Sequence, residues 1–440
     1  MNDSLRHHGA RALAALALLL VPTLAHAQDA GLDPADSGDT AWLLAATLLG
    51  LLLVLPGIGL FYAGRVRTQS MLSVLTQTVA VTALVSLLWI VVGYTLAFGT
   101  VSNGWLGSGS AWMLIDLGNV RADTLVPESA YALFEMVFAL AAPALMIGAW
   151  VDRARFGWVL GFCALWSLMV YAPIAHWIWG GGWLATRLGT VDYAGGLVIH
   201  TSAGVSALVV ALLMGRRERF AQAAARSGGF PLLTLLGGAM IWLGSLAMAG
   251  GSALAAGDDA AMALINTHVA IATAALAWLL LDRLGGARPG PTGLARGALA
   301  GLALIAPVAA YTSPGMAVVL GLVAALIAKG TARLVQGHLQ IDDSLGVFAG
   351  QGMTGIAGTM LTALVLHPAL GGTGYGPGMT LAHQVVGQAV GVVAVAAWSA
   401  IATAIAALMV SMALPMRVTR DEEMAGLDAT CHGEAMLQQD

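Results

Sequence analysis

The chain has 440 residues, of which 58% are hydrophobic and only 10% are charged. Soluble domains average about 45–50% apolar and about 25% charged residues, so this composition excludes an ordinary soluble enzyme and a disordered scaffold. The formal net charge of −4, with a single lysine, offers no basic surface for nucleic acid. The two cysteines cannot form a disulfide framework, and no spacing of histidines or cysteines indicates a metal site. We therefore expect a polytopic membrane protein without a metal or another cofactor.

Residues 1–27 have the pattern of a secretory signal peptide. Arg6 and Arg11 precede an apolar run over residues 12–24, which ends in Ala25-His26-Ala27. A basic start, a short apolar core and an A-x-A end predict cleavage after Ala27. The alternative is an uncleaved first helix, but this run is shorter than the roughly 20 residues that a bilayer requires. Cleavage places the mature amino terminus outside the inner membrane.

Eleven apolar runs of spanning length follow within residues 39–414. They lie at 41–63, 71–98, 129–150, 156–177, 193–214, 231–254, 260–281, 294–311, 314–330, 346–366 and 382–413. An odd number of spans puts the two chain ends on opposite sides of the membrane. The polar residues 415–440 are then predicted to form a cytoplasmic tail.

The basic residues support this orientation. Only Arg121 and Arg187 fall in loops predicted to lie outside. Fifteen others fall in segments predicted to lie inside: Arg65, Arg67, Arg153, Arg155, Arg216, Arg217, Arg219, Arg226, Arg283, Arg288, Arg296, Lys329, Arg333, Arg417 and Arg420. Such a bias is typical of a bacterial inner-membrane protein whose basic loops face the cytoplasm.

An inverted repeat is visible in the polar residues. Residues 192–204 and 343–355 both read D-x-x-G-x-x-x-x-(H or Q)-x-x-x-G, five spans apart. We therefore expect an all-α membrane protein with five spans repeated in inverted order and an eleventh helix outside the repeat. The repeat predicts that His200 and Gln351 meet near the midplane, where polar groups usually mark a substrate path. The alternative is an interhelical hydrogen bond that only holds the helices together.

Several segments resemble the ammonium transporter and Rhesus protein family, from about Asp39 to Glu434. The similar segments are residues 56–64, 71–77, 93–99, 172–182, 192–200 and 426–434. The chain is identified as a divergent bacterial member of this family. The resemblance implies a homotrimer in which each protomer carries ammonium or ammonia through its own hydrophobic pore.

The resemblance also implies an outer cation site at Phe138, Trp179 and Ser252. An aromatic face attracts a small cation, and a serine hydroxyl can accept a hydrogen bond from ammonium. Without the resemblance, the two aromatic residues could equally serve packing. Asp192 matches a buried aspartate with an electrostatic and structural role, and His200 matches the first of two pore histidines.

The sequence departs from the family pattern in the second half. Gln351 stands where the second pore histidine is expected, and Gly346 stands where an aspartate is usual. A carboxamide does not titrate near neutral pH, so it cannot copy a histidine proton relay. Met248 replaces a gating phenylalanine, and Ser245 replaces a neighbouring tryptophan. We therefore expect changed proton coupling, changed selectivity or both. Glu135, in the third span, is either a vestibule charge or a protonated helix contact.

Ammonium transport is the leading interpretation, and an enzyme is not expected because no nucleophile and base are placed together. One alternative is an ammonium sensor with little flux, and another is a channel for methylamine or carbon dioxide. In the family, a PII-type regulatory protein docks on the cytoplasmic face, which residues 216–219 and 415–434 would supply here. The same arginines could also serve only as a positive-inside anchor.

Overall fold

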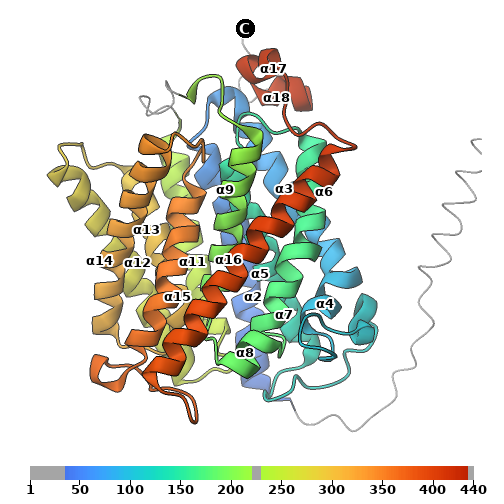
Figure 1. Ribbon diagram of the computed structural model, residues 1–440, viewed down its shortest axis with the longest axis vertical. Helices are drawn as coiled ribbons and strands as arrows, with labels where there is room; N and C mark the ends of the chain where they lie inside the picture. The colour runs from blue at the N-terminus through green and yellow to red at the C-terminus, as the bar shows by residue number, and fades with distance from the viewer. Residues whose placement is uncertain (1–34, 221–228, 435–440) are drawn as a thin grey trace, which may run out of the picture.

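The structure, a computed structural model, describes residues 35–220 and 229–434, so the predicted signal peptide lies outside the described residues. The described chain is a helical bundle without β-strands, in which pairing is limited to isolated bridges. Ten of its helices are long and apolar enough to cross a membrane (Figure 1). The all-helical membrane architecture is therefore confirmed.

The first five spans are built from eight α-helices. These are α2 (Ser37–Ala63), α3 (Met71–Leu88), α4 (Tyr94–Phe98), α5 (Glu128–Met146), α6 (Phe156–Trp166), α7 (Ala172–Ile178), α8 (Trp183–Leu188) and α9 (Ser202–Met214). Short 3-10 and π-helical segments extend or join them: η1 (Thr68–Ser70), η2 (Trp89–Gly93), η3 (Gly109–Leu114), η4 (Ile147–Ala149), η5 (Ser167–Tyr171) and η6 (Gly196–Thr201).

The remaining spans and the tail also consist of α-helices joined or extended by short 3-10 and π-helical segments. Their α-helices are α11 (Pro231–Gly251), α12 (Asp258–Leu284), α13 (Pro291–Ile305), α14 (Pro314–Ala332), α15 (Met353–Val365), α16 (Leu381–Ser411), α17 (Arg420–Ala425) and α18 (Leu427–His432). Their short segments are η7 (Ala306–Val308), η8 (Arg333–His338), η9 (Phe348–Gly352) and η10 (Pro368–Leu370).

Of the eleven predicted spans, only 346–366 is not among the ten helices that are long and apolar enough to cross a membrane. It is nevertheless helical, because η9 leads directly into α15, and α15 packs against α13 and α16 inside the bundle (Figure 1). Gln351, four glycines and three threonines between residues 348 and 365 make this segment less apolar than a typical span. Its position is consistent with an eleventh span.

The two copies of the repeat motif begin with the same capping turn. The Asp192 carboxylate accepts hydrogen bonds from the backbone N–H groups of residues 195–198, at 2.6–3.1 Å. The Asp343 carboxylate accepts from the N–H groups of Val347 and Phe348, at 2.9 and 2.8 Å. The glycine three residues later has a left-handed backbone in both copies, with φ +99° and +76°. A carboxylate at this place satisfies N–H groups that the helix itself leaves without partners.

The last glycine of each motif lets the two copies cross closely. A Cβ on Gly355 would lie 2.6 Å from the Gly196 carbonyl oxygen and 2.9 Å from the His200 Cβ. A Cβ on Gly204 would overlap the Gly352 backbone. Because η6 packs on α15 while η9 packs on α9, the two helices run antiparallel, as an inverted repeat requires. Small residues are what such a close approach needs.

The tail forms a folded cap on one end of the bundle (Figure 1). Helix α18 packs against α3, and the Asp428 carboxylate accepts hydrogen bonds from the Leu72 and Ser73 N–H groups at 3.1 and 2.7 Å. Arg67 donates to the Glu423 carbonyl oxygen at 2.6 Å. Helix α16 ends at Ser411 and α17 begins at Arg420, so the docked tail follows the last long helix.

A buried ion cluster lies at the same end. Asp342, whose side chain is fully buried, lies 3.5 Å from the Arg153 guanidinium and 2.9 Å from that of Arg217. Arg217 also lies 3.4 Å from Asp152. These contacts tie the segment before η9 to the ends of α5 and α9. Arg153 and Arg217, two of the basic residues predicted to lie inside, therefore lie together at the tail-bearing end.

Candidate functional site

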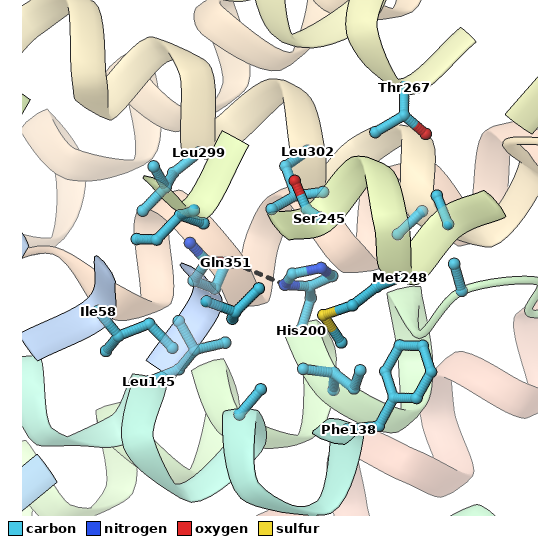
Figure 2. Close-up of a pocket in the computed structure, with 17 residues that line it drawn as sticks. Ile58, Phe138, Leu145, His200, Ser245, Met248, Thr267, Leu299, Leu302 and Gln351 are labelled. Carbon is cyan, nitrogen blue, oxygen red and sulfur yellow. Dashed lines mark hydrogen bonds between the residues drawn. The ribbon is translucent and has the colours of Figure 1, made fainter. Parts of the chain in front are cut away.

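A cavity lies inside the bundle. Its lining residues come mainly from α2, α5, α11, α12, α13, η7 and the two π-helical segments η6 and η9. The side chains that face it are almost all apolar; the polar exceptions are His200, Ser245, Thr267 and Gln351. Figure 2 shows His200 and Gln351 side by side within this lining. An apolar wall disfavours a charged species and admits a small neutral one.

His200 and Gln351 form a direct hydrogen bond across the repeat. The His200 Nδ1 lies 2.6 Å from the Gln351 Oε1, and both side chains are buried (Figure 2). An amide oxygen can only accept, so Nδ1 carries the proton and donates it. The His200 Nε2 is then left with a lone pair that can accept a hydrogen bond from ammonia or water.

Met248 and Phe138 lie at one side of this pair. Figure 2 shows the Met248 sulfur between the His200 ring and the Phe138 ring. Met248 is 7% exposed, and both residues line the cavity. A methionine side chain has more rotatable bonds than an aromatic ring, so it can adjust its position more easily. Ser245 lies one turn earlier on α11, also facing the cavity.

The aromatic residues of the expected outer site are brought together. The ring centroids of Phe138 and Trp179 lie 5.3 Å apart at an interplanar angle of 58°. Trp179 donates from its indole nitrogen to the Asp192 carbonyl oxygen at 2.6 Å, which fixes the indole. Phe134 meets Phe138 edge-on at 5.3 Å. Trp179 itself does not line the described cavity, so Phe138 connects the aromatic group to the cavity.

Ser252 stands at the end of α11 near this aromatic group. Its hydroxyl donates to the Met248 carbonyl oxygen at 3.0 Å, which leaves its lone pairs free to accept. The preceding Gly251 packs directly against the Phe134 ring. Ser252 is partly exposed and lies outside the cavity lining.

Asp192 and Glu135 are both buried but differ in their partners. Both oxygens of Asp192 are occupied by backbone N–H groups, so this carboxylate holds η6 in place and is not free to bind a ligand. Glu135 is 6% exposed, does not line the cavity, and its Oε2 is without a hydrogen bond among the described residues. Glu135 therefore does not face this cavity.

The sequence did not indicate a second cavity, which lies between the first and the tail-bearing end of the bundle. Phe61, Arg65, Trp278 and Arg296 line it, and Gln351 lines both cavities. The sequence pattern identifies Arg65 and Arg296 only as basic residues predicted to lie inside. The position of Arg296 could have indicated this cavity. Arg296 falls inside the predicted span 294–311, and a charged residue within a span is costly and usually marks a functional site.

The comparisons agree with this architecture. Residues 41–437 match the sequence profile of the Ammonium Transporter Family. An ammonium transporter of Aquifex aeolicus is 37% identical over 96% of this chain and 99% of that protein. The ammonium transporter Amt1 of Archaeoglobus fulgidus is 36% identical over 91% and 99%, respectively.

Solved structures give the same result. The structure of Saccharomyces cerevisiae Mep2 superposes with a TM-score of 0.79 at 31% identity, covering 88% of this chain and 90% of that chain. A structure described as a sensor Amt protein superposes with a TM-score of 0.83 at 26% identity, covering 89% and 98%. The chain therefore belongs to the ammonium transporter family, as a multi-pass membrane protein that transports ammonium and is not an enzyme.

Proposed function

We propose that ammonium is held at the aromatic site, loses its proton there, and crosses the bundle as neutral ammonia past the His200–Gln351 pair. Phe138 and Trp179 would attract the cation with their ring faces, and Ser252 would accept one of its hydrogen bonds. Met248 would then have to move, because its side chain lies between Phe138 and His200 (Figure 2).

The hydrogen bond between His200 and Gln351 is the observation that carries this proposal. It joins two buried polar side chains in a cavity whose other walls are almost entirely apolar. A full charge at such a place costs several kcal/mol, whereas ammonia loses only hydrogen bonds that the free His200 Nε2 can in part replace. Because Gln351 does not titrate, a proton cannot pass through it as it would through a second histidine.

We infer the remaining features from the sequence pattern and the family. Residues 1–27 would be removed, and residues 39–414 would lie in the inner membrane of a bacterium as a homotrimer. The mature amino terminus would be outside and the tail in the cytoplasm. The clustering of Arg153, Arg217 and Arg417 at the tail-bearing end supports this orientation.

A PII-type regulatory protein would dock on the tail-bearing face. Glu218, in the basic run, pairs with Arg420 at 3.2 Å, and its backbone N–H donates to the Glu423 carboxylate. A partner that contacts residues 216–219 would therefore also contact the tail. An anchor role for the same arginines remains compatible with these contacts.

Internal alkalinisation of proteoliposomes after an ammonium pulse tests the transport path. Met248→Trp fills the cavity next to His200 and is expected to reduce the alkalinisation rate to that of empty liposomes. Met412→Trp is the matched control, because Met412 is 83% exposed at the end of α16. A Met248→Trp rate equal to the wild-type rate would contradict the proposed path. No alkalinisation by the wild-type protein would favour the sensor alternative.

A further inference from the structure

The second cavity combines two positive charges with a direct connection to the transport path. Arg65 follows the end of α2, and Arg296 lies in the second turn of α13; both line this cavity. Leu299 and Gln351 line both cavities, so the two spaces meet at the Gln351 side chain. Whatever occupies the second cavity therefore lies next to one end of the path.

In the part of the chain that the structure describes, neither arginine forms a direct ion pair. Within 4.0 Å of either guanidinium there is no acidic oxygen among the residues that the structure describes. Arg65 donates to the Leu345 carbonyl oxygen at 2.6 Å, and its Cζ lies 4.9 Å from the Phe61 ring centroid. Arg296 lies over the Trp278 ring, also at 4.9 Å. Aromatic faces orient these side chains, but they do not balance their charge.

The acidic residues of the neighbouring segments are already engaged. Both Asp343 oxygens accept backbone N–H groups at the start of η9. Asp282 pairs with Lys329 at 2.5 Å. Gly346, between these segments, has no side chain, and a Cβ there would lie 3.4 Å from the Arg296 guanidinium. Among the described residues, the two guanidinium groups therefore have no carboxylate in direct contact, and Asp343 acts on them only through space.

We propose that this cavity binds a small oxyanion of the phosphate or bicarbonate class between Arg65 and Arg296. The planar guanidinium fork matches two oxygens of such an anion, and half-buried charges without a carboxylate in direct contact favour a counter-ion. Figure 2 shows the Gln351 amide nitrogen pointing away from His200 towards Leu299, where it offers a further donor. This inference goes beyond transport, because it concerns a ligand that binds in the absence of ammonium.

Calorimetric titration of the purified protein with inorganic phosphate, in phosphate-free detergent at constant ionic strength, tests the proposal. Saturable binding is expected, and Arg65→Gln and Arg296→Gln should each weaken it at least about tenfold. Arg333→Gln is the matched control, since Arg333 is exposed at the same end of the bundle, outside the cavity lining. Arg296→Lys keeps the charge without the fork, so it should retain the fold and bind phosphate with intermediate affinity.

The same titration in nanodiscs distinguishes a free anion from a lipid headgroup. Equal phosphate affinity in phosphatidylcholine and phosphatidylglycerol nanodiscs would assign the site to a free oxyanion. Loss of phosphate binding only in phosphatidylglycerol would assign it to the headgroup of an anionic lipid. Absence of saturable binding, or equal weakening by Arg333→Gln and Arg296→Gln, would overturn the proposal.

Discussion

His200 donates a hydrogen bond from its Nδ1 to the Gln351 Oε1 across 2.6 Å, and this bond joins the two copies of the inverted repeat at the centre of the bundle. Each side chain lies eight residues after an aspartate that caps its helix. The pair is therefore held by the backbone geometry of both copies.

Removing the acceptor should destabilise the centre of the bundle. In Gln351→Leu the His200 N–H stays buried without a partner, which costs about 1–3 kcal/mol of unfolding free energy. We expect a lower thermal unfolding temperature in detergent. Gln340→Leu is the control, because Gln340 is exposed and its side chain donates only to the carbonyl oxygens of Gln336 and Gly337. Equal unfolding temperatures for both variants would show that the hydrogen bond between His200 and Gln351 does not stabilise the fold.

Adding one methyl group where the repeats cross should block transport. The new Cβ in Gly355→Ala would lie 2.9 Å from the His200 Cβ, so the helices must separate or His200 must move. Overpacking of this kind costs about 1–3 kcal/mol. We expect the alkalinisation rate to fall towards that of empty liposomes. Gly330→Ala on α14 meets no atom within 4 Å and should transport normally.

The helical spans and the repeat could be predicted because they depend on patterns of neighbouring residues in the sequence. Long apolar runs predict helices in lipid, and the spacing from Asp192 to Gly204 recurs from Asp343 to Gly355. The meeting of His200 with Gln351 followed from that repeat. The proximity of Phe138 and Trp179 came from the family resemblance.

Features that depend on distant contacts could not be predicted. Arg65 follows the end of α2, and only packing against the segment at Leu345 brings it to the second cavity. The docking of the tail depends on Gly426, whose left-handed backbone lies against Gln69. The pattern of apolar residues also does not show that η6 and η9 are π-helical rather than α-helical.

The buried ion cluster should make stability depend on Asp342. Asp342→Asn leaves Arg153 buried without its charge partner, which typically costs about 3–5 kcal/mol. The exposed Asp421→Asn serves as the control. We expect a clear loss of thermal stability in the first variant only. Equal stability of the two variants would show that the cluster does not hold these segments together.

The same cluster predicts a pH dependence. Burial by itself raises the pKa of Asp342, but the Arg153 and Arg217 charges together hold it below its ordinary value of 3.8. A carboxylate with a lowered pKa contributes stability above its unfolded pKa and loses it as the pH falls through the folded value. We therefore expect the stability difference between wild type and Asp342→Asn to be constant above about pH 5 and to shrink below about pH 4. A difference that stays unchanged down to pH 2 would contradict this assignment.

The docking of the tail can be followed at Cys431. The Asp428 carboxylate accepts two N–H groups at the start of α3, so Asp428→Ala should loosen α18. Burial raises the pKa of the Cys431 thiol, and release of α18 should speed its reaction with a maleimide. Cys163 is fully buried and should stay silent in the folded protein. The control Glu434→Ala, in the same tail, should leave the Cys431 rate unchanged.

The central claim is that neutral ammonia, and not a relayed proton, passes the His200–Gln351 pair. The most direct test measures ammonium-evoked current and internal alkalinisation on the same proteoliposomes, for the wild type and for Gln351→His. Because histidine titrates near neutral pH and glutamine does not, we expect Gln351→His to raise the ratio of current to alkalinisation and to make it depend on pH. An unchanged ratio with an unchanged pH dependence would contradict the account.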